Sequence, residues 1–166
     1  MVLRLLQVVL LVALSAAADT GDLPPVTWGG SPVEVIAEPH LCRGPLEVDE
    51  GVSVHLCTRP VLDHEAIVSL YFVDGAYACF SVTMQTAGAT TDQAQREFDE
   101  VVDRLEATIG PCSERSGTTT GGSVVTWTAN GETVRAVVDP SGTTTLIGIV
   151  AFPDGQRQRI ARLLSW

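Results

Sequence analysis

The sequence predicts an α+β fold: an antiparallel sheet, made of a hairpin and a three-stranded meander, with one long helix packed on it and a short C-terminal helix. Three observations predict this fold. Asp74-Gly75 and Asn130-Gly131 each separate two runs of β-prone residues, and apolar residues between 94 and 109 recur with the period of a helix. We expect about five or six strands in the sheet.

Residues 1–18 have the pattern of an export signal. Arg4 supplies the charged start, residues 5–14 form an apolar core interrupted by Gln7, and alanines at 16–18 form a small-residue cleavage site. We therefore expect a secreted or periplasmic protein. Since no cysteine follows the cleavage site and no later apolar run could span a bilayer, we expect no stable membrane anchor after cleavage. Ten arginines without a lysine indicate a GC-rich, bacterial source.

Residues 19–32 are rich in proline and glycine, which predicts a flexible leader with little order before Val33. Residues 33–166 then form a single disulfide-bonded domain. At its start we expect two short strands, at 33–37 and 52–57, separated by turn residues.

The two short turns set the register of the strands beside them. Asp-Gly and Asn-Gly both accept positive φ at two successive residues, which a tight hairpin requires. Centring the first turn on Asp-Gly places Leu70 opposite Cys79, and centring the second on Asn-Gly places Trp127 opposite Val134. A longer turn then leads into a third strand at 143–151.

The long helix is predicted by one apolar face, formed by Ala94, Phe98, Val101, Val102, Leu105 and Ile109. Thr90 with Gln93 resembles a capping box, and Gly110 followed by proline ends the pattern. A shorter helix is expected at about 155–164.

Four cysteines in an exported chain predict two disulfide bonds; they are Cys42, Cys57, Cys79 and Cys112. A helix that returns antiparallel across the sheet brings its C-terminal end near the start of the preceding strand. This argument favours Cys79 with Cys112, which leaves Cys42 with Cys57 to close a loop of about fifteen residues. Spacing does not exclude the other two connectivities.

Two histidines lie next to the first two cysteines. His40 and His55 each stand two residues before a cysteine, so two imidazoles and two thiolates could form a tetrahedral zinc or copper(I) site. Oxidation of the cysteines would remove both sulfur ligands. We therefore expect no metal and no cofactor, and keep His40 and His55 as secondary metal candidates.

Asp63-His64-Glu65 places a histidine between two carboxylates, the setting of a general base. Neighbouring residues in a strand or turn point apart, however, and neither a Gly-x-Ser-x-Gly motif nor an unpaired thiol supports nucleophilic catalysis. The triplet therefore predicts a solvated turn. We assign no catalytic residue, and a non-enzymatic role is favoured.

The segment 113–123 is long, polar and set between two rigid elements, which is typical of a binding loop. Its candidate binding residues are Thr118, Thr119 and Thr120.

The formal net charge of −10 disfavours nucleic acid as a partner, and a protein, in particular a basic one, fits better. The sequence thus predicts an exported, non-enzymatic interaction or accessory domain of the inhibitor, immunity or envelope-assembly type. The alternative is a small periplasmic enzyme or metal-binding factor that uses His40, His55 and His64. Whether these three side chains converge on one pocket distinguishes the two hypotheses.

Overall fold

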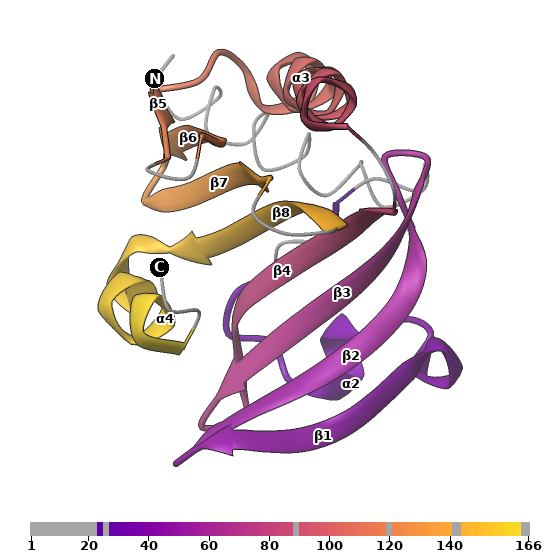
Figure 1. The fold of residues 1–166 in the computed structure, drawn as a ribbon. Helices are drawn as coiled ribbons and strands as arrows, with labels where there is room; N and C mark the ends of the chain where they lie inside the picture. Colours follow the sequence, from indigo (N-terminus) through magenta and orange to yellow (C-terminus); the bar gives the residue numbers. More distant parts are fainter. Residues whose placement is uncertain (1–22, 25–26, 88–89, 119–120, 141–143, 164–166) are drawn as a thin grey trace.

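The computed structural model describes residues 23–163 except 25–26, 88–89, 119–120 and 141–143 (Figure 1). The predicted export signal lies outside the described residues. These residues form an eight-stranded antiparallel sheet with the order β1-β2-β3-β4-β8-β7-β6-β5, which confirms the α+β fold. The strands are β1 (Cys42–Asp49), β2 (Val52–Val61), β3 (His64–Val73), β4 (Ala76–Ala87), β5 (Glu114–Gly117), β6 (Ser123–Ala129), β7 (Glu132–Asp139) and β8 (Thr144–Pro153).

The helices are α2 (Pro32–Val35), α3 (Thr91–Ile109) and α4 (Arg157–Leu163), with 3₁₀ turns η2 (Pro39–Leu41) and η3 (Asp154–Gln156). The sheet consists of two four-stranded meanders that meet where β4 pairs with β8. The connection from β4 to β5, which contains α3, therefore leads from the centre of the sheet to its far edge.

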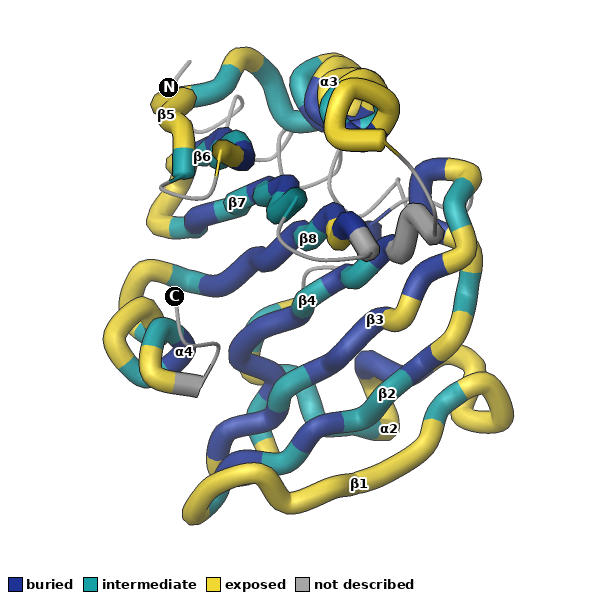
Figure 2. The backbone as a smooth tube through the Cα atoms, in the orientation of Figure 1, coloured by how far each residue is buried: buried dark blue, intermediate teal, exposed yellow. Residues whose placement is uncertain are grey.

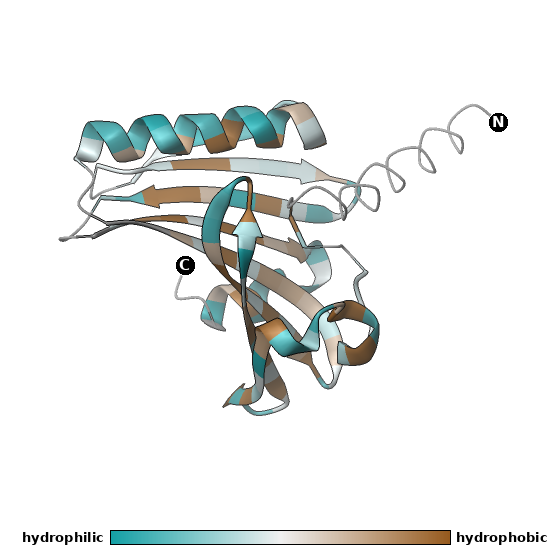
Figure 3. Ribbon diagram, turned by 90° about the vertical axis from the view of Figure 1, so that its right-hand side faces the viewer, coloured by the Kyte–Doolittle hydropathy of each residue, from teal (hydrophilic) through white to brown (hydrophobic). Residues whose placement is uncertain are grey.

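One face of the sheet, here called the helix face, carries α2 and α3 and the main hydrophobic core. The predicted apolar face of α3 is confirmed, because Ala94, Phe98, Val101, Val102 and Leu105 are buried. The hydroxyl of Thr90 accepts a hydrogen bond from the backbone N–H of Gln93 at 3.3 Å, and Gly110 ends the helix. Figure 3 shows α3 along one side of the sheet with mostly hydrophilic residues on its outer surface.

The opposite face, here called the open face, is covered at one end by α4. Ile160 of α4 packs there with Cys79, Val150 and Phe152. These strand residues alternate with core residues of the helix face such as Phe80 and Ile149, so they project to the other side of the sheet. In Figure 1, α4 lies beside β8 while α2 is seen behind β2 and β3.

The segment 27–32 is packed against the sheet, where the sequence predicted a flexible leader. The backbone N–H of Gly29 donates to the carbonyl oxygen of Tyr77, and the N–H of Tyr77 donates to the carbonyl oxygen of Gly30, both at 2.8 Å. The Trp28 ring stacks on Tyr77 at 5.2 Å between centroids, and its indole N–H donates to the Glu132 carboxylate at 2.8 Å. An aromatic anchor therefore corrects the expectation of little order before Val33.

The predicted strand at 33–37 is wrong, because this segment contains helix α2. Ser31 is the N-cap, and the carboxylate of Glu34 accepts from both its backbone N–H and its hydroxyl, at 2.7 and 2.8 Å. Pro32 occupies the first helical position, where a missing N–H costs nothing. Capping at this end outweighs the β-propensity of the valines.

The register of the first hairpin also differs from the predicted register by one residue. The turn is confirmed, since Phe72 lies opposite Tyr77, but a bulge then places Tyr71 opposite Cys79 and Leu70 opposite Phe80. A bulge adds one residue to one strand, and a one-residue shift moves each later side chain to the other face. Cys79 therefore points to the open face instead of the helix face.

The second hairpin has the predicted register, with Trp127 opposite Val134. The sheet is larger than predicted because β1 and β5 add a strand at each edge. Pro45 lies in β1, an edge position where a residue without an N–H is tolerated. Figure 2 shows β1 as exposed along most of its length, in contrast to the buried central strands.

Candidate functional site

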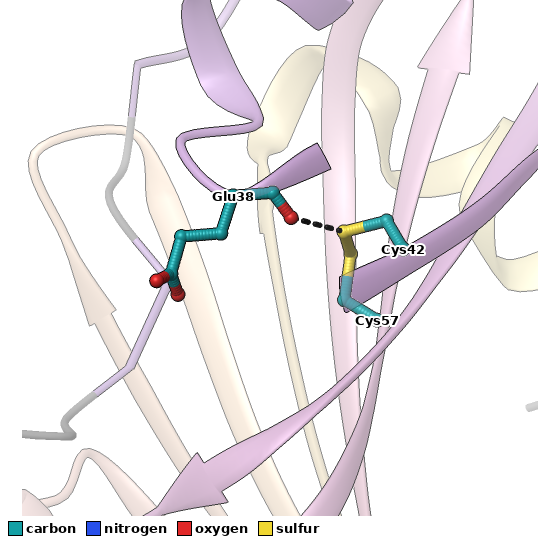
Figure 4. The surroundings of a disulfide bond; sticks show 3 residues. All are labelled: Glu38, Cys42 and Cys57. Atoms are coloured by element: carbon teal, nitrogen blue, oxygen red, sulfur yellow. Dashed lines mark hydrogen bonds between the residues drawn. A yellow bond between two sulfur atoms is a disulfide. The ribbon is translucent and has the colours of Figure 1, made fainter. Parts of the chain in front are cut away.

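The predicted bridge between Cys42 and Cys57 is confirmed. The two residues are direct partners across β1 and β2, with their Cα atoms 4.0 Å apart. Figure 4 shows the disulfide beside the backbone carbonyl of Glu38, whose oxygen lies 3.6 Å from the Cys42 sulfur. A disulfide sulfur carries no hydrogen, so this is a close contact and not a hydrogen bond. The bridge fixes edge strand β1 to the sheet at the end where η2 enters.

The predicted bridge between Cys79 and Cys112 is not formed, and both residues are free thiols. The bulge turns Cys79 to the open face, where it is fully buried, whereas Cys112 packs against the core of the helix face. The end of α3 also lies near β6, since Trp127 donates to the carbonyl oxygen of Gly110 at 3.0 Å. β6 is three strands from β4, a lateral separation of roughly 14 Å.

The Cys112 thiol is half-buried at the C-terminal end of α3. A hydrogen bond with the Glu106 carboxylate, with some burial and the negative charge of Glu106, raises the pKa of this thiol. Burial raises the pKa of Cys79 much further. Both cysteines are therefore protonated at neutral pH, which is the opposite of an activated nucleophile.

The three histidines do not converge. His40 is exposed in η2, and His55 is half-buried in β2 with its ring edge-on to Phe72 at 5.4 Å. Burial lowers the pKa of His55. His64 pairs with Val61, six residues further along β2, which places it about 20 Å from His55 at roughly 3.3 Å per residue.

The described residues contain no group of three or more His, Cys, Asp or Glu side chains that could hold a metal ion. The disulfide also occupies the two sulfur atoms that the His40 and His55 hypothesis needs.

Asp63 lies in the hairpin turn between β2 and β3, as predicted, whereas His64 and Glu65 begin strand β3 and pair with Val61 and Pro60. Leu62 and Asp63 both have positive φ there, at 50° and 65°. The Asp63 carboxylate accepts a hydrogen bond from Arg104 of α3 at 2.7 Å, so the turn is held against the helix. This carboxylate therefore forms an exposed ion pair with the helix.

Thr118 directly follows β5, in the connection to β6. Its hydroxyl accepts a hydrogen bond from the N–H of Gly122 at 2.7 Å, and its own N–H donates to the carbonyl oxygen of Gly122 at 2.8 Å. Thr119 and Thr120 lie outside the described residues. The hydroxyl of Thr118 thus closes the loop.

A surface that sequence analysis did not identify is the part of the open face beyond α4. Its central row crosses five strands through Thr58, Ile67, Thr83, Gly148 and Val137, which are successive partners in the sheet. We define the open-face patch as this row together with Leu56 and Leu146 of the neighbouring rows. All its side chains are apolar or hydroxyl-bearing.

Two large hydrophobic side chains stand out of the patch, since Ile67 is 51% exposed and Leu146 is 44% exposed. Around it lie charged residues of the same face, with Glu65 two residues before Ile67, Glu114 in β5 and Arg135 in β7. An uncharged centre with a charged border distinguishes this patch from the outer side of α3.

Among the helices of the described part of the chain, none has the length and apolar character needed to cross a membrane. Comparisons of the whole chain with protein-family models, with curated proteins and with solved structures gave no match. The geometry of the chain itself therefore carries the functional argument.

Proposed function

We propose that the protein is an exported, non-enzymatic interaction domain that binds a basic protein through the open-face patch. The observation that carries this proposal is the exposure of Ile67 and Leu146 on a sheet face that α4 covers at one end only. Contiguous exposed apolar surface with a polar border is typical of protein-binding sites. The part of this face that α4 leaves uncovered among the described residues also offers a rigid platform, because its strands from β2 to β7 are held by neighbours on both sides.

Charge determines the kind of partner. The chain carries a net charge of −10, and the carboxylates of Glu65 and Glu114 border the patch. Such a surface attracts a positively charged protein at long range and repels acidic ones. The apolar centre then supplies the desolvated contact, while the border supplies orientation.

Site-specific photo-crosslinking in the native host tests the proposal. A photoreactive amino acid replaces Ile67 in one variant and Val48 in the control, which is 50% exposed in edge strand β1. We expect a basic protein to be captured at position 67 and not at position 48. Capture of a second copy of this chain, of an acidic protein, or of the same proteins at both positions would contradict the proposal.

Matched substitutions then measure the contribution of the patch. Ile67→Asp and Val48→Asp add the same charge at strand positions of nearly equal exposure. We expect Ile67→Asp to weaken binding of the captured protein at least about tenfold, equivalent to ~1.4 kcal/mol. Val48→Asp should leave it nearly unchanged, and raised salt should slow association of the wild-type protein.

A further inference from the structure

A cleft of about 270 Å³ lies between α2, η2, the start of β1 and His55 of β2. Its apolar walls are formed by Pro32, Val33, Ile36, Pro39 and the disulfide-bonded Cys42. Among the described residues that line the cleft, His55 carries the single ionisable side chain, so no carboxylate or guanidinium contributes to it. Small-molecule sites combine such apolar walls with a few polar groups that fix orientation.

His55 presents a neutral imidazole to the cleft. It precedes Cys57 by two residues in β2, so it lies on the helix face beside the disulfide. Its ring packs edge-on to Phe72, and among the described residues neither ring nitrogen has a hydrogen-bond partner. Burial lowers the pKa of His55, so at neutral pH one nitrogen accepts a hydrogen bond and the other donates one.

A bulge in β1 forms the wall of the cleft next to this imidazole. The pairing of β1 with β2 shifts register here, so Gly44 and Pro45 together lie opposite His55. A Cβ on Gly44 would lie 3.3 Å from Cγ of His55 and 2.8 Å from a carbonyl oxygen of β2. Glycine therefore lets the β1 backbone approach the imidazole directly. Bulges that re-aim a side chain in this way are frequent beside functional sites.

The rim of the cleft leaves apolar surface in water. Val33 is 91% exposed, the highest fraction among the large hydrophobic side chains of the described part of the chain. A ligand with an apolar body would cover this surface and gain from its burial. A volume of about 270 Å³ lies near the lower limit for small-molecule sites, so a body of one ring is the appropriate size.

We propose that this cleft binds small neutral phenols. The phenol hydroxyl donates a hydrogen bond to the unprotonated nitrogen of His55, and the ring lies against Ile36 and Pro39. One hydroxyl matches the one ionisable side chain of the cleft, and a rigid ring loses no internal rotation on binding, unlike an alkyl chain of the same area. The site is on the opposite face of the sheet from the open-face patch and does not depend on it.

Nuclear magnetic resonance titration of the wild-type protein with p-cresol tests the site. We expect p-cresol to shift the backbone amides of Val33, Ile36, Gly44 and His55. Toluene lacks the hydroxyl and methylcyclohexanol lacks the flat ring, so each should bind at least about fivefold more weakly than p-cresol. This comparison of ligands needs no substitution and therefore holds whatever a variant does to the fold.

A substitution at His55 then tests its role. His55→Phe keeps a ring against Phe72 and removes both nitrogens, so it should weaken p-cresol at least about fivefold and leave toluene unchanged. His64→Phe makes the same change at the other end of the hairpin of β2 and β3 and should have no effect.

A second variant changes the cleft without altering His55. Val33→Asp places a charge at the apolar rim and should weaken p-cresol, whereas Val48→Asp, at an exposed position in β1, should not. The proposal is overturned if p-cresol shifts none of these amides, if toluene or methylcyclohexanol binds as well as p-cresol, or if a folded His55→Phe binds p-cresol as the wild type does. Ile67→Asp should bind p-cresol normally, which separates this result from the test of the protein partner.

Discussion

The guanidinium of Arg159 lies 3.6 Å from the carboxylate of Asp74, which connects α4 to the turn between β3 and β4. The same guanidinium donates to the carbonyl oxygen of Glu50 at 3.2 Å, in the turn between β1 and β2. The two turns also meet directly, since the N–H of Asp74 donates to the carbonyl oxygen of Gly51 at 2.7 Å. The ion pair is largely exposed and contributes less than about 1 kcal/mol. The backbone contact at Gly51 is therefore the more sensitive part of this junction.

Gly51→Ala should destabilise the protein more than Gly75→Ala. Both glycines have positive φ, at 66° and 79°, which costs an alanine about 1–2 kcal/mol. A Cβ at Gly51 would in addition collide with the Asp74 carboxylate, whereas a Cβ at Gly75 would meet open space. Urea denaturation measures both free energies of unfolding. Equal losses would show that the Asp74 side chain moves aside without cost.

Removal of the Cys42–Cys57 bridge should lower the free energy of unfolding by about 3 kcal/mol, as expected for a closed loop of fifteen residues. The variant is Cys42→Ala with Cys57→Ala, and guanidinium denaturation gives the loss. The control is Cys112→Ala, which removes a half-buried free thiol and should cost only a few tenths of a kcal/mol.

Thiol titration of the unreduced, denatured wild type checks the same connectivity. We expect two thiols, from Cys79 and Cys112. Finding none would instead support the second bridge that the sequence predicts.

Local signals were enough to predict the parts of the fold that depend on neighbouring residues. Asn130-Gly131 determines its hairpin in full, and the apolar period with the Thr90 cap determines α3. The bulge in β4 has no signal among the residues next to it in the sequence. It lies at Ala78, which packs with Val52 and Val73, and Val52 belongs to a different hairpin strand. Cys79 was assigned to the wrong face for this reason, and the second disulfide prediction failed with it.

The candidate sites depend on still longer contacts. Alternation of Ile67 with Ala66 and Val68 could indicate that Ile67 faces away from the core. Ile67 is exposed, however, because α4 packs on Cys79, Val150 and Phe152 and does not extend to Ile67. No sequence pattern near Ile67 predicts where α4 packs. A pocket on the helix face is lined by residues between Pro24 and Leu70, and its walls include Val35 of α2, in the segment where sequence analysis expected a strand.

Glu106→Gln should make Cys112 more reactive. The hydrogen bond and negative charge of Glu106 hold the pKa of Cys112 above its ordinary value of 9.0, and a neutral amide removes the charge. Alkylation follows the thiolate fraction, so its pH profile should move to lower pH in the variant. Iodoacetamide labelling of the native protein between about pH 7 and 10 gives this profile. An unchanged profile would show that Glu106 does not control the thiol, and Cys79 should stay unlabelled throughout because it is buried.

Tyr77→Phe should not destabilise the protein at neutral pH. The Tyr77 ring packs between Trp28 and Phe72, but within the described part of the chain its buried hydroxyl has no hydrogen-bond partner. Removing an unsatisfied buried hydroxyl while keeping the ring leaves the free energy of unfolding unchanged or raises it by about 1 kcal/mol. Chemical denaturation at pH 7 measures the change. A loss larger than about 1 kcal/mol would show that the hydroxyl has a partner, such as a buried water.

The same substitution should reduce the loss of stability at alkaline pH. Burial raises the pKa of Tyr77 well above its ordinary value of 10.0, so the folded protein keeps the proton while the unfolded chain loses it. The contribution of Tyr77 to the free energy of unfolding is therefore fully present below pH 10 and is lost as the pH rises above 10. Cys79 acts in the same way from about pH 9, since burial raises its pKa above 9.0. Denaturation between pH 7 and 11 should thus show a shallower decline above pH 10 in Tyr77→Phe, with the earlier decline due to Cys79 retained. Parallel curves for variant and wild type above pH 10 would mean that folding does not raise the pKa of Tyr77.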